Sequence, residues 1–334
     1  MAASVRQSYF EFLRLVCMMM VLSAHAIGYV DETVLTASNG VWKTIFNQFF
    51  LVCVNVFVMI SGWFGIKASW KGAGKLLFQV LYISMLCVTV FLILGLPVSF
   101  HRDILPNLLF GSGYWFVVAY LILYAISPIL NAFIEHASQK EYRNVLIAWM
   151  IVEFVYGFLL DTGHFAYGFS PLSCIGLYLL ARYVRLYPCK LFSLSIGQDF
   201  LIYAGISLLS AIGFWFGYKW FGMGFHLNHY DSPLAIIASL YFLLAFSKMR
   251  FQNKVINWLA SSAFAIYLIH TNSLVYPHYV DGAHHILFNN NPGISAILLS
   301  GYILIIALIC IVLDKPRVLL WKKLSEALSS RTEE

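Results

Sequence analysis

Residues 9–30 read YFEFLRLVCMMMVLSAHAIGYV, an apolar run long enough to cross a bilayer as a helix. Arg14 and His25 lie eleven residues apart within this run. The eleven helical steps between them turn through about 1,100°, within roughly 20° of three full turns, so both side chains lie on one face. They lie roughly 16 Å apart along the axis. Ionisable groups at membrane depth are costly, so the pair indicates a polar path used for function.

The composition extends this pattern to the whole chain. Hydrophobic residues make up 61% and charged residues 11% of the 334 residues, whereas soluble domains average about 25% charged. We therefore expect an all-α polytopic membrane protein, residues 1–334, with about ten transmembrane helices in one bundle and both termini cytoplasmic. The apolar segments predicted to be helical are 9–30, 45–66, 76–96, 114–133, 144–160, 170–187, 199–220, 232–247, 255–277 and 294–313, followed by a short cytoplasmic tail, 314–334.

The basic residues support this orientation. With both termini inside, all but three of the 21 Lys and Arg residues fall on the cytoplasmic side, the exceptions being Lys43, Arg102 and Lys219. Such a bias is typical of multi-pass membrane proteins. The net charge of +6 therefore reflects topology, and we expect no nucleic-acid partner. The six cysteines show no metal-ligand spacing, and the outer histidines show none beyond His284-His285, so no metal is predicted.

His25 and Arg14 are the first candidate site residues. An imidazole is the side chain suited to proton transfer near neutrality, which makes His25 a candidate general base. The alternative is a helix-packing histidine bound to a neighbouring carbonyl. Arg14 has the planar fork that binds phosphate through paired hydrogen bonds. Its alternative role is to extend toward the lipid headgroups from the cytoplasmic end of its helix.

Glu153 is the one carboxylate deep inside an apolar span. Such a group must be neutral or paired, and Arg14 and Arg182 are the partners we consider. A catalytic role and a structural ion pair between helices both remain open.

A basic segment follows the second predicted helix. Lys67, Lys71 and Lys75, separated by two glycines, predict a flexible loop able to hold a polyphosphate ligand. The positive-inside bias alone would also place lysines there. Just before this segment, Ser61-Gly62 predicts close approach of a neighbouring helix.

Further polar residues lie late in the chain, in AIYLIHTN, residues 265–272. His270 is predicted at the same depth as His25, and Tyr267 and Asn272 accompany it. These residues, with Ser61, are candidates for acceptor binding or for polar core positions. Whether His270 shares a site with His25 is open. The histidines expected outside the membrane are predicted to lie in surface loops: His101, His164, His226, His229, His278, His284 and His285.

Four ordered segments resemble motifs of the acyltransferase-3 family of bacterial membrane acyltransferases. They are Tyr9-x4-Arg14-x10-His25; Val56 to Phe64 with its Ser61-Gly62; Tyr114-Trp115-Phe116 leading to Tyr124 and Pro128; and Phe264 to His270. The resemblance runs from residue 9 to about residue 320. It departs from the family where many relatives have an Arg-x2-Arg pair after the second helix, because this chain has Lys71 and Lys75. Arg182 and Arg185 are the guanidinium groups that would replace that pair.

The resemblance implies an O-acetyltransferase of the bacterial inner membrane. It would move an acetyl group from cytoplasmic acetyl-CoA, a substrate rather than a tightly bound cofactor, to a hydroxyl of a capsule, exopolysaccharide, O-antigen or lipid-linked sugar. Arg14, Lys71, Lys75, Arg182 and Arg185 would bind the donor, and His25 would act as general base. A transporter of glycan intermediates and a scaffold subunit are the alternatives. The acceptor sugar, the acyl group, direct transfer against an acyl-enzyme, and the oligomeric state stay open.

Overall fold

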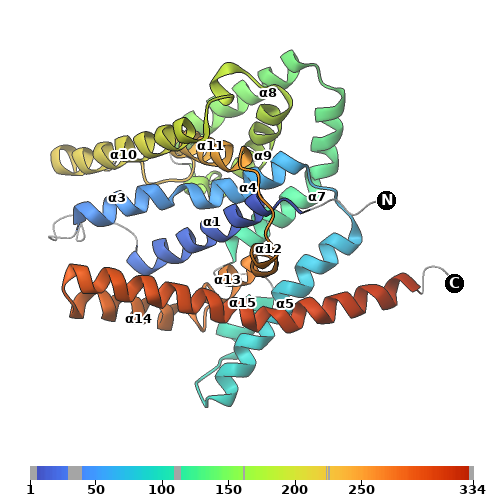
Figure 1. Ribbon diagram of the computed structural model, residues 1–334, viewed down its shortest axis with the longest axis vertical. Coiled ribbons are helices and arrows are strands. Elements are labelled where there is room, and N and C mark those ends of the chain that lie inside the picture. Colours follow the sequence, from blue (N-terminus) through green and yellow to red (C-terminus); the bar gives the residue numbers. More distant parts are fainter. Residues whose placement is uncertain are drawn as a thin grey trace. The chain divides into compact units, whose positions relative to one another are not determined.

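The computed structural model describes residues 6–28, 40–108, 114–160, 162–222, 224 and 226–330, except the side chains of Arg102, Asn107, Leu108 and residues 328–330. The predicted end of the first helix at 29–30 and the last residues of the predicted tail, 331–334, lie outside this part of the chain. The described residues form helices and no strand (Figure 1).

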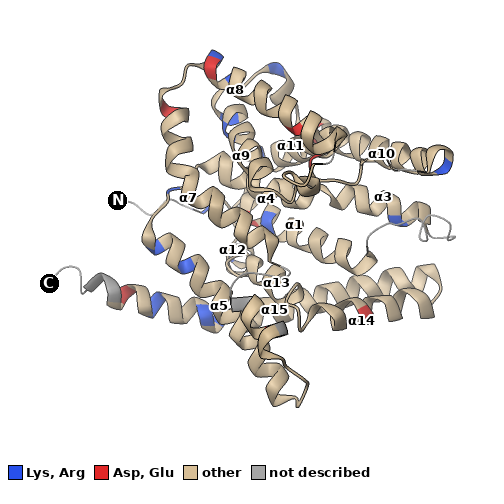
Figure 2. Cartoon of the chain, turned by 180° about the vertical axis from the view of Figure 1, so that it is seen from behind, with Lys and Arg blue, Asp and Glu red and all other residues tan. Residues whose placement is uncertain are grey.

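Seven helices in the described residues are long and apolar enough to cross a membrane. They are Ser8–Ile27, Gly40–Phe64, Trp70–Ile93, Trp115–His136, Gln139–Leu159, Ile196–Phe221 and Pro292–Ala327. The chain is therefore an all-α, multi-pass membrane protein, as predicted. Most of the ribbon carries no charged residue, and Lys, Arg, Asp and Glu are few along the helices (Figure 2).

The chain divides into two compact units. Unit 1 comprises Met1–Lys67 and Ala119–Gln252, and unit 2 comprises Ala68–Val118 and Asn253–Glu334. Unit 1 contains α1 (Ser8–Ile27), α3 (Gly40–Phe50), α4 (Val52–Phe64), most of α7 (Trp115–His136), α8 (Gln139–Val152), α9 (Pro171–Leu186), α10 (Ile196–Phe221) and α11 (Pro233–Ser247). Unit 2 contains α5 (Trp70–Ile93), α6 (Leu105–Leu108), α12 (Lys254–Ala260), α13 (Ala263–His270), α14 (Tyr276–Asn289) and α15 (Pro292–Ser330).

In unit 1, α4 packs against α9 and α11, and α10 runs beside α11 (Figure 1). The contact with α9 depends on Gly62, since a Cβ atom there would lie 2.2 Å from the carbonyl oxygen of Tyr178. The close approach predicted from Ser61-Gly62 is therefore confirmed. Three short segments complete the unit: the π-helix η2 (Glu153–Leu159), which continues α8, and the 3₁₀ turns η3 (Ala166–Gly168) and η4 (Lys190–Phe192).

The prediction of a flexible basic loop before α5 is wrong. Ser69 begins the helix, because its hydroxyl accepts a hydrogen bond from the Gly72 amide at 3.1 Å. Lys71 and Lys75 consequently lie on the first turns of α5. They are four residues apart and so share one face.

The prediction of one helix at 255–277 is also wrong. The structure has two helices there, α12 and α13, and the second ends at His270. Lys315 stabilises the break by donating to the Trp258 carbonyl at 2.6 Å and to the Ser261 hydroxyl at 3.0 Å. At the other end, the Asn272 carboxamide accepts the Leu274 amide at 3.1 Å and turns the chain. Helix α14, which follows, was not predicted.

The last helix continues beyond the predicted end at residue 313, to Ser330. Asp314 and Arg317 lie one turn apart within it and form a buried ion pair. A pair at this spacing supports a helix across the point where the apolar run ends. Pro316 lies inside the same helix.

Candidate functional site

Helix α1 is unbroken from Ser8 to Ile27, so the predicted register of Arg14 and His25 holds along one face. The two residues lie toward opposite ends of the helix. Each has a distinct environment within unit 1.

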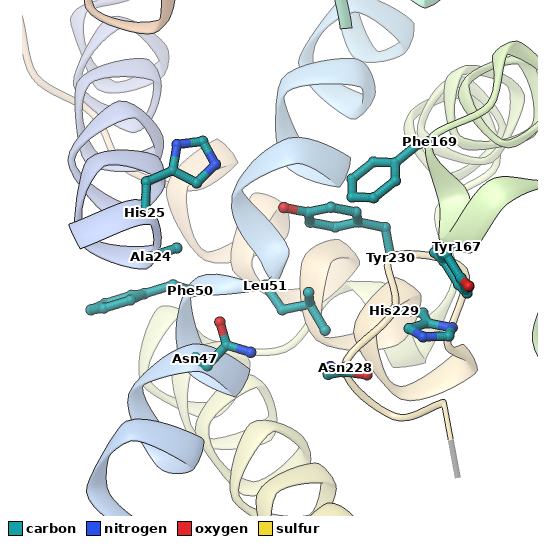
Figure 3. A pocket seen from close by; sticks show the side chains of 10 residues that line it. All are labelled: Ala24, His25, Asn47, Phe50, Leu51, Tyr167, Phe169, Asn228, His229 and Tyr230. Atoms are coloured by element: carbon teal, nitrogen blue, oxygen red, sulfur yellow. The ribbon is translucent and has the colours of Figure 1, made fainter. Parts of the chain in front are cut away.

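His25 lines a cavity of about 300 Å³ in unit 1 (Figure 3). The other lining residues come from the α3–α4 junction, the η3 turn and the segment before α11: Ala24, Asn47, Phe50, Leu51, Tyr167, Phe169, Asn228, His229 and Tyr230. His25 and His229 lie on opposite sides, and the hydroxyl end of Tyr230 is directed toward the side of His25. The cavity thus brings together segments far apart in the chain.

The wall opposite His25 is built by two chain segments that hold each other. The Tyr230 amide donates to the Tyr167 carbonyl at 3.0 Å, and the Asn55 carboxamide on α4 donates to the Tyr230 carbonyl at 2.9 Å. Gly168 has a φ of 86°, and a Cβ there would lie 2.7 Å from the Tyr230 Cβ. Only glycine fits both this backbone conformation and this contact.

The described lining of the cavity carries no fixed charge. Among the described residues it contains no Lys, Arg, Asp or Glu, but it has four aromatic rings and two carboxamides. Apolar and aromatic walls with a few hydrogen-bonding groups are typical of small-molecule sites. This lining suits a neutral ligand that carries hydroxyl groups.

Arg14 lies outside this cavity and is paired with Glu11, whose Oε1 lies 2.7 Å from the Arg14 Nη1 atom. The Arg14 side chain is 34% exposed. It also interacts electrostatically with Tyr120 on α7, whose hydroxyl lies 3.1 Å from that of Ser61. Ser61 is thus placed on the Arg14 side of unit 1. Glu11 is a partner that the sequence analysis missed, although it lies three residues before Arg14, a spacing typical of helical ion pairs.

Arg182 and Arg185 meet at the end of α4. Both donate to the Trp63 carbonyl, Arg182 at 3.2 Å. The Arg185 guanidinium also lies 5.4 Å from the centroid of the Phe64 ring. One carbonyl engages only one of the five N–H groups of each guanidinium. The remaining donors suit an anionic ligand.

The first turn of α1 lies at the same end of unit 1. The ring of Phe10 is 4.7 Å from that of Phe64, centroid to centroid. Arg14 follows Phe10 by one turn of helix, so the three arginines predicted to bind one donor come from two helices, α1 and α9, that both pack against α4.

Arg250 is a fourth arginine at this end, and the sequence analysis counted it only as a topology signal. Its guanidinium lies 5.4 Å from the centroid of the Tyr9 ring, and its Nη1 donates to the Ser247 carbonyl at 2.8 Å. Its position directly after an apolar helix was the only sequence signal.

Glu153 is buried, with 2% of its surface exposed, where α8 passes into η2. The polar groups that interact with it are Ser173, Asp231 and Trp149. The described residues contain no ion pair between Glu153 and Arg14 or Arg182. Glu153 and Asp231 line a second hollow of about 420 Å³, whose other walls are mainly apolar side chains of α8 and α11.

The remaining candidates belong to unit 2. Lys71 and Lys75 are exposed on α5. His270 is fully buried, and its Nδ1 lies 2.5 Å from the Ile266 carbonyl oxygen. The Asn272 carboxamide donates to the Tyr114 hydroxyl at 2.9 Å. Tyr267 is buried among aromatic rings, with the Phe116 centroid at 5.9 Å. The three late residues thus form part of the polar and aromatic core of unit 2.

The surface loops predicted for the outer histidines are wrong for several of them. His226 and His229 are half-buried in the segment before α11. His278, His284 and His285 lie on α14 rather than in a loop. Packing of the η3 segment against the segment before α11 buries the first two, and the unpredicted α14 accounts for the others.

Comparison with protein families gives a match over nearly the whole chain. The model of the family described as "Acyltransferase domain" (Acyl_transf_3) matches residues 7–312. No curated protein and no solved structure matches the chain. The matched region contains α1 with Arg14 and His25, every segment that lines the cavity, and the arginines at the end of α4. The chain therefore belongs to the acyltransferase-3 family of membrane acyltransferases.

Proposed function

We propose that this protein is an O-acetyltransferase of the bacterial cytoplasmic membrane. It takes an acetyl group from cytoplasmic acetyl-CoA and delivers it to a hydroxyl of an extracytoplasmic or lipid-linked sugar, of the capsule, exopolysaccharide or O-antigen type. Family membership supports acyl transfer by a multi-pass membrane protein. The observation that carries the finer proposal is the position of His25 in an uncharged cavity, at the opposite end of α1 from an arginine cluster.

The arginine cluster is the proposed donor site. CoA carries several phosphate charges, and guanidinium groups bind phosphate through paired, charge-assisted hydrogen bonds. Arg182 and Arg185 meet at the end of α4 in unit 1, and Arg14 lies one helical turn after Phe10, whose ring contacts that of Phe64 at the same end. Lys71 and Lys75, which the sequence also predicted to bind the donor, lie on one face at the N-terminus of α5 in unit 2. Acetyl-CoA is bound as a substrate that enters and leaves, not as a resident cofactor.

The length of α1 fits the donor. Arg14 and His25 are roughly 16 Å apart along the axis, and the pantetheine arm of CoA is long enough to span such a distance. Phosphates held at the arginine cluster would therefore place the thioester beside His25.

The chemistry is a direct transfer. His25 removes the proton from the acceptor hydroxyl as its oxygen attacks the thioester carbonyl. A C–O bond forms, the C–S bond breaks, and the proton passes from the imidazolium to the departing thiolate, giving free CoA and the acetyl ester. General base catalysis of this kind contributes about 10²–10⁴-fold in rate.

The lining of the cavity supports a sugar as acceptor. Aromatic rings provide flat apolar surfaces, and carboxamides and the Tyr230 hydroxyl provide hydrogen bonds to hydroxyl groups. A phosphorylated acceptor group would find no Lys or Arg among the described lining residues.

The test uses the purified protein in lipid nanodiscs with radiolabelled acetyl-CoA. Envelope membranes from host cells that lack the protein provide the acceptor. We expect label in the glycan fraction and release of an equal amount of free CoA thiol. The exposed His164 provides a matched control, because His164→Ala should retain both signals. Transport of glycan without thiol release would contradict the proposal and favour a transporter.

A further inference from the structure

A second imidazole faces the cavity from the wall opposite His25. His229 lies in the segment between α10 and α11, and 15% of its side chain is exposed (Figure 3). The proposed reaction uses His25 and leaves His229 without a role. Its surroundings show that it is held in one orientation.

A buried carboxylate lies behind His229. The Nδ1 atom of His229 is 3.9 Å from the Oδ1 atom of Asp231, whose residue surface is 1% exposed. This distance is longer than a hydrogen bond, so the carboxylate acts on the ring through its negative charge, which favours a proton on Nδ1 and leaves Nε2 as an acceptor. Asp231 is thus placed to direct His229 into the cavity.

The Asp231 carboxylate packs against Gly157 of η2. A Cβ atom at Gly157 would lie 3.0 Å from the Oδ2 atom of Asp231, so glycine makes room for the carboxylate. Glu153, at the start of the same π-helical segment, also interacts with Asp231. Placing two carboxylates together in a buried region is unfavourable, and π-helical turns occur frequently at functional sites.

The His229 ring is fixed from both sides. The Tyr167 ring lies 4.3 Å away, edge-on, and the His226 ring is stacked at 4.9 Å with an interplanar angle of 12°. The three described non-glycine residues with positive φ all lie in the two segments that form this wall: Ala166 (46°), Tyr167 (62°) and His226 (55°). Such conformations persist only where the surrounding structure imposes them, and they cluster at binding and active sites.

We infer that His229, oriented by Asp231, binds a hydroxyl group of the acceptor sugar across the cavity from His25. This inference rests on the proposed function and assigns the acceptor side of the same site. His229 accepts a hydrogen bond through Nε2, and the acceptor lies between the two imidazoles against the rings of Tyr167 and Tyr230. His25 then acts on the hydroxyl that is acetylated, and His229 selects and holds the sugar. Asp231 is a positioning residue.

The experiment measures both apparent KM values in the nanodisc assay. His229→Ala should raise the apparent KM for acceptor membranes about tenfold, the effect of losing one good hydrogen bond. The apparent KM for acetyl-CoA should stay within about twofold, since the donor arginines are untouched. Asp231→Asn should shift the acceptor KM in the same direction by a smaller factor. His229→Gln, which keeps a hydrogen-bonding side chain, should recover part of the loss.

Several outcomes would overturn the inference. An unchanged acceptor KM in His229→Ala, or an equal rise in both KM values, contradicts an acceptor-specific role. Failure of His229→Gln to differ from His229→Ala contradicts hydrogen bonding. If His229→Ala unfolds below the assay temperature, the apparent KM values for acceptor and for acetyl-CoA are compared in His229→Gln and Asp231→Asn instead. Absence of acetyl transfer by the unmodified protein would instead refute the proposed function, and it would be seen before any variant is tested.

Discussion

Unit 1 and unit 2 both bury polar side chains, but they use them differently. In unit 2 the buried polar groups bind one another: the Asn272 carboxamide donates to the Tyr114 hydroxyl, which donates to the Leu268 carbonyl at 2.8 Å. Asp314 pairs with Arg317, and both are buried. Unit 1 also contains such pairs, for example Asp199 with Lys248. In addition, His25 and His229 line a cavity, and the guanidinium groups of Arg182 and Arg185 have N–H donors that do not bind the Trp63 carbonyl.

The buried polar atoms that make no hydrogen bond of normal geometry show the same contrast. In the described part of unit 2 they are the hydroxyls of Ser84 and Ser262. In unit 1 they include both carboxylate oxygens of Glu153, the indole nitrogen of Trp149 and the hydroxyl of Ser173. Ser173 and Trp149 both interact with Glu153, so these groups form one buried polar cluster. Under the proposed function, we expect unit 2 to contribute mainly to stability and unit 1 to binding and chemistry.

The sharpest test of this difference is His25→Ala. We expect acetyl transfer to fall by about 10²–10⁴-fold, because the general base is lost. The melting temperature in detergent should change little, since the half-buried ring faces a cavity. Transfer at the unmodified rate, measured as CoA thiol release, would remove His25 from the mechanism.

The strongest expected effect in unit 2 is on stability. Asp314→Asn leaves the Arg317 guanidinium buried without its charged partner, which typically costs about 3–5 kcal/mol. The double variant Asp314→Asn, Arg317→Met should regain much of this loss, because no uncompensated charge remains. Thermal unfolding in detergent measures both. A double variant no more stable than the single one would contradict a tightly coupled pair.

A smaller effect is expected at the arginine cluster. Arg14→Ala should raise the apparent KM for acetyl-CoA by about tenfold or more, since hydrogen bonds to charged groups are worth about 1.5–3 kcal/mol. Arg14→Lys should recover only part of this, because an ammonium group lacks the bidentate fork. Calorimetric titration with CoA checks the same change in binding. Equal CoA affinity of all three proteins would exclude Arg14 from the donor site.

The smallest effect is expected at His270, the histidine predicted at the depth of His25. His270→Gln removes the contact of the ring with the Ile266 carbonyl and should cost about 1 kcal/mol of stability. Transfer per folded molecule should stay within about twofold, because the residue belongs to the core of unit 2. A large loss of activity at an unchanged melting temperature would show that unit 2 also carries catalytic groups.

Local sequence patterns predicted a large part of this protein. The apolar runs predicted the all-α membrane fold, and the spacing of Arg14 and His25 predicted their shared helix face. Ser61-Gly62 predicted a close helix contact. The ordered motifs predicted the family that the match over residues 7–312 confirms. These features depend on neighbours along the chain or within one helix, where periodicity is a reliable guide.

Sequence periodicity failed where a side chain from elsewhere decides the backbone. Lys315 stabilises the break between α12 and α13, although it lies more than fifty residues later in the chain. A hydropathy pattern does not contain this information, because Trp258 and Ser261 lie in an ordinary apolar segment. The cap at Ser69 shows a local signal that was overlooked, because two nearby glycines suggested a loop.

By itself the sequence determined the fold class, the family, and the placement of a guanidinium and an imidazole on one helix face. Only the tertiary structure decided which polar residues share a site. It brought Arg182 and Arg185 to the end of α4, set His229 opposite His25, and buried His270 in a core. The physical reason is that a cavity is made by segments distant in the chain, whose packing depends on side-chain volume and hydrogen bonding between helices.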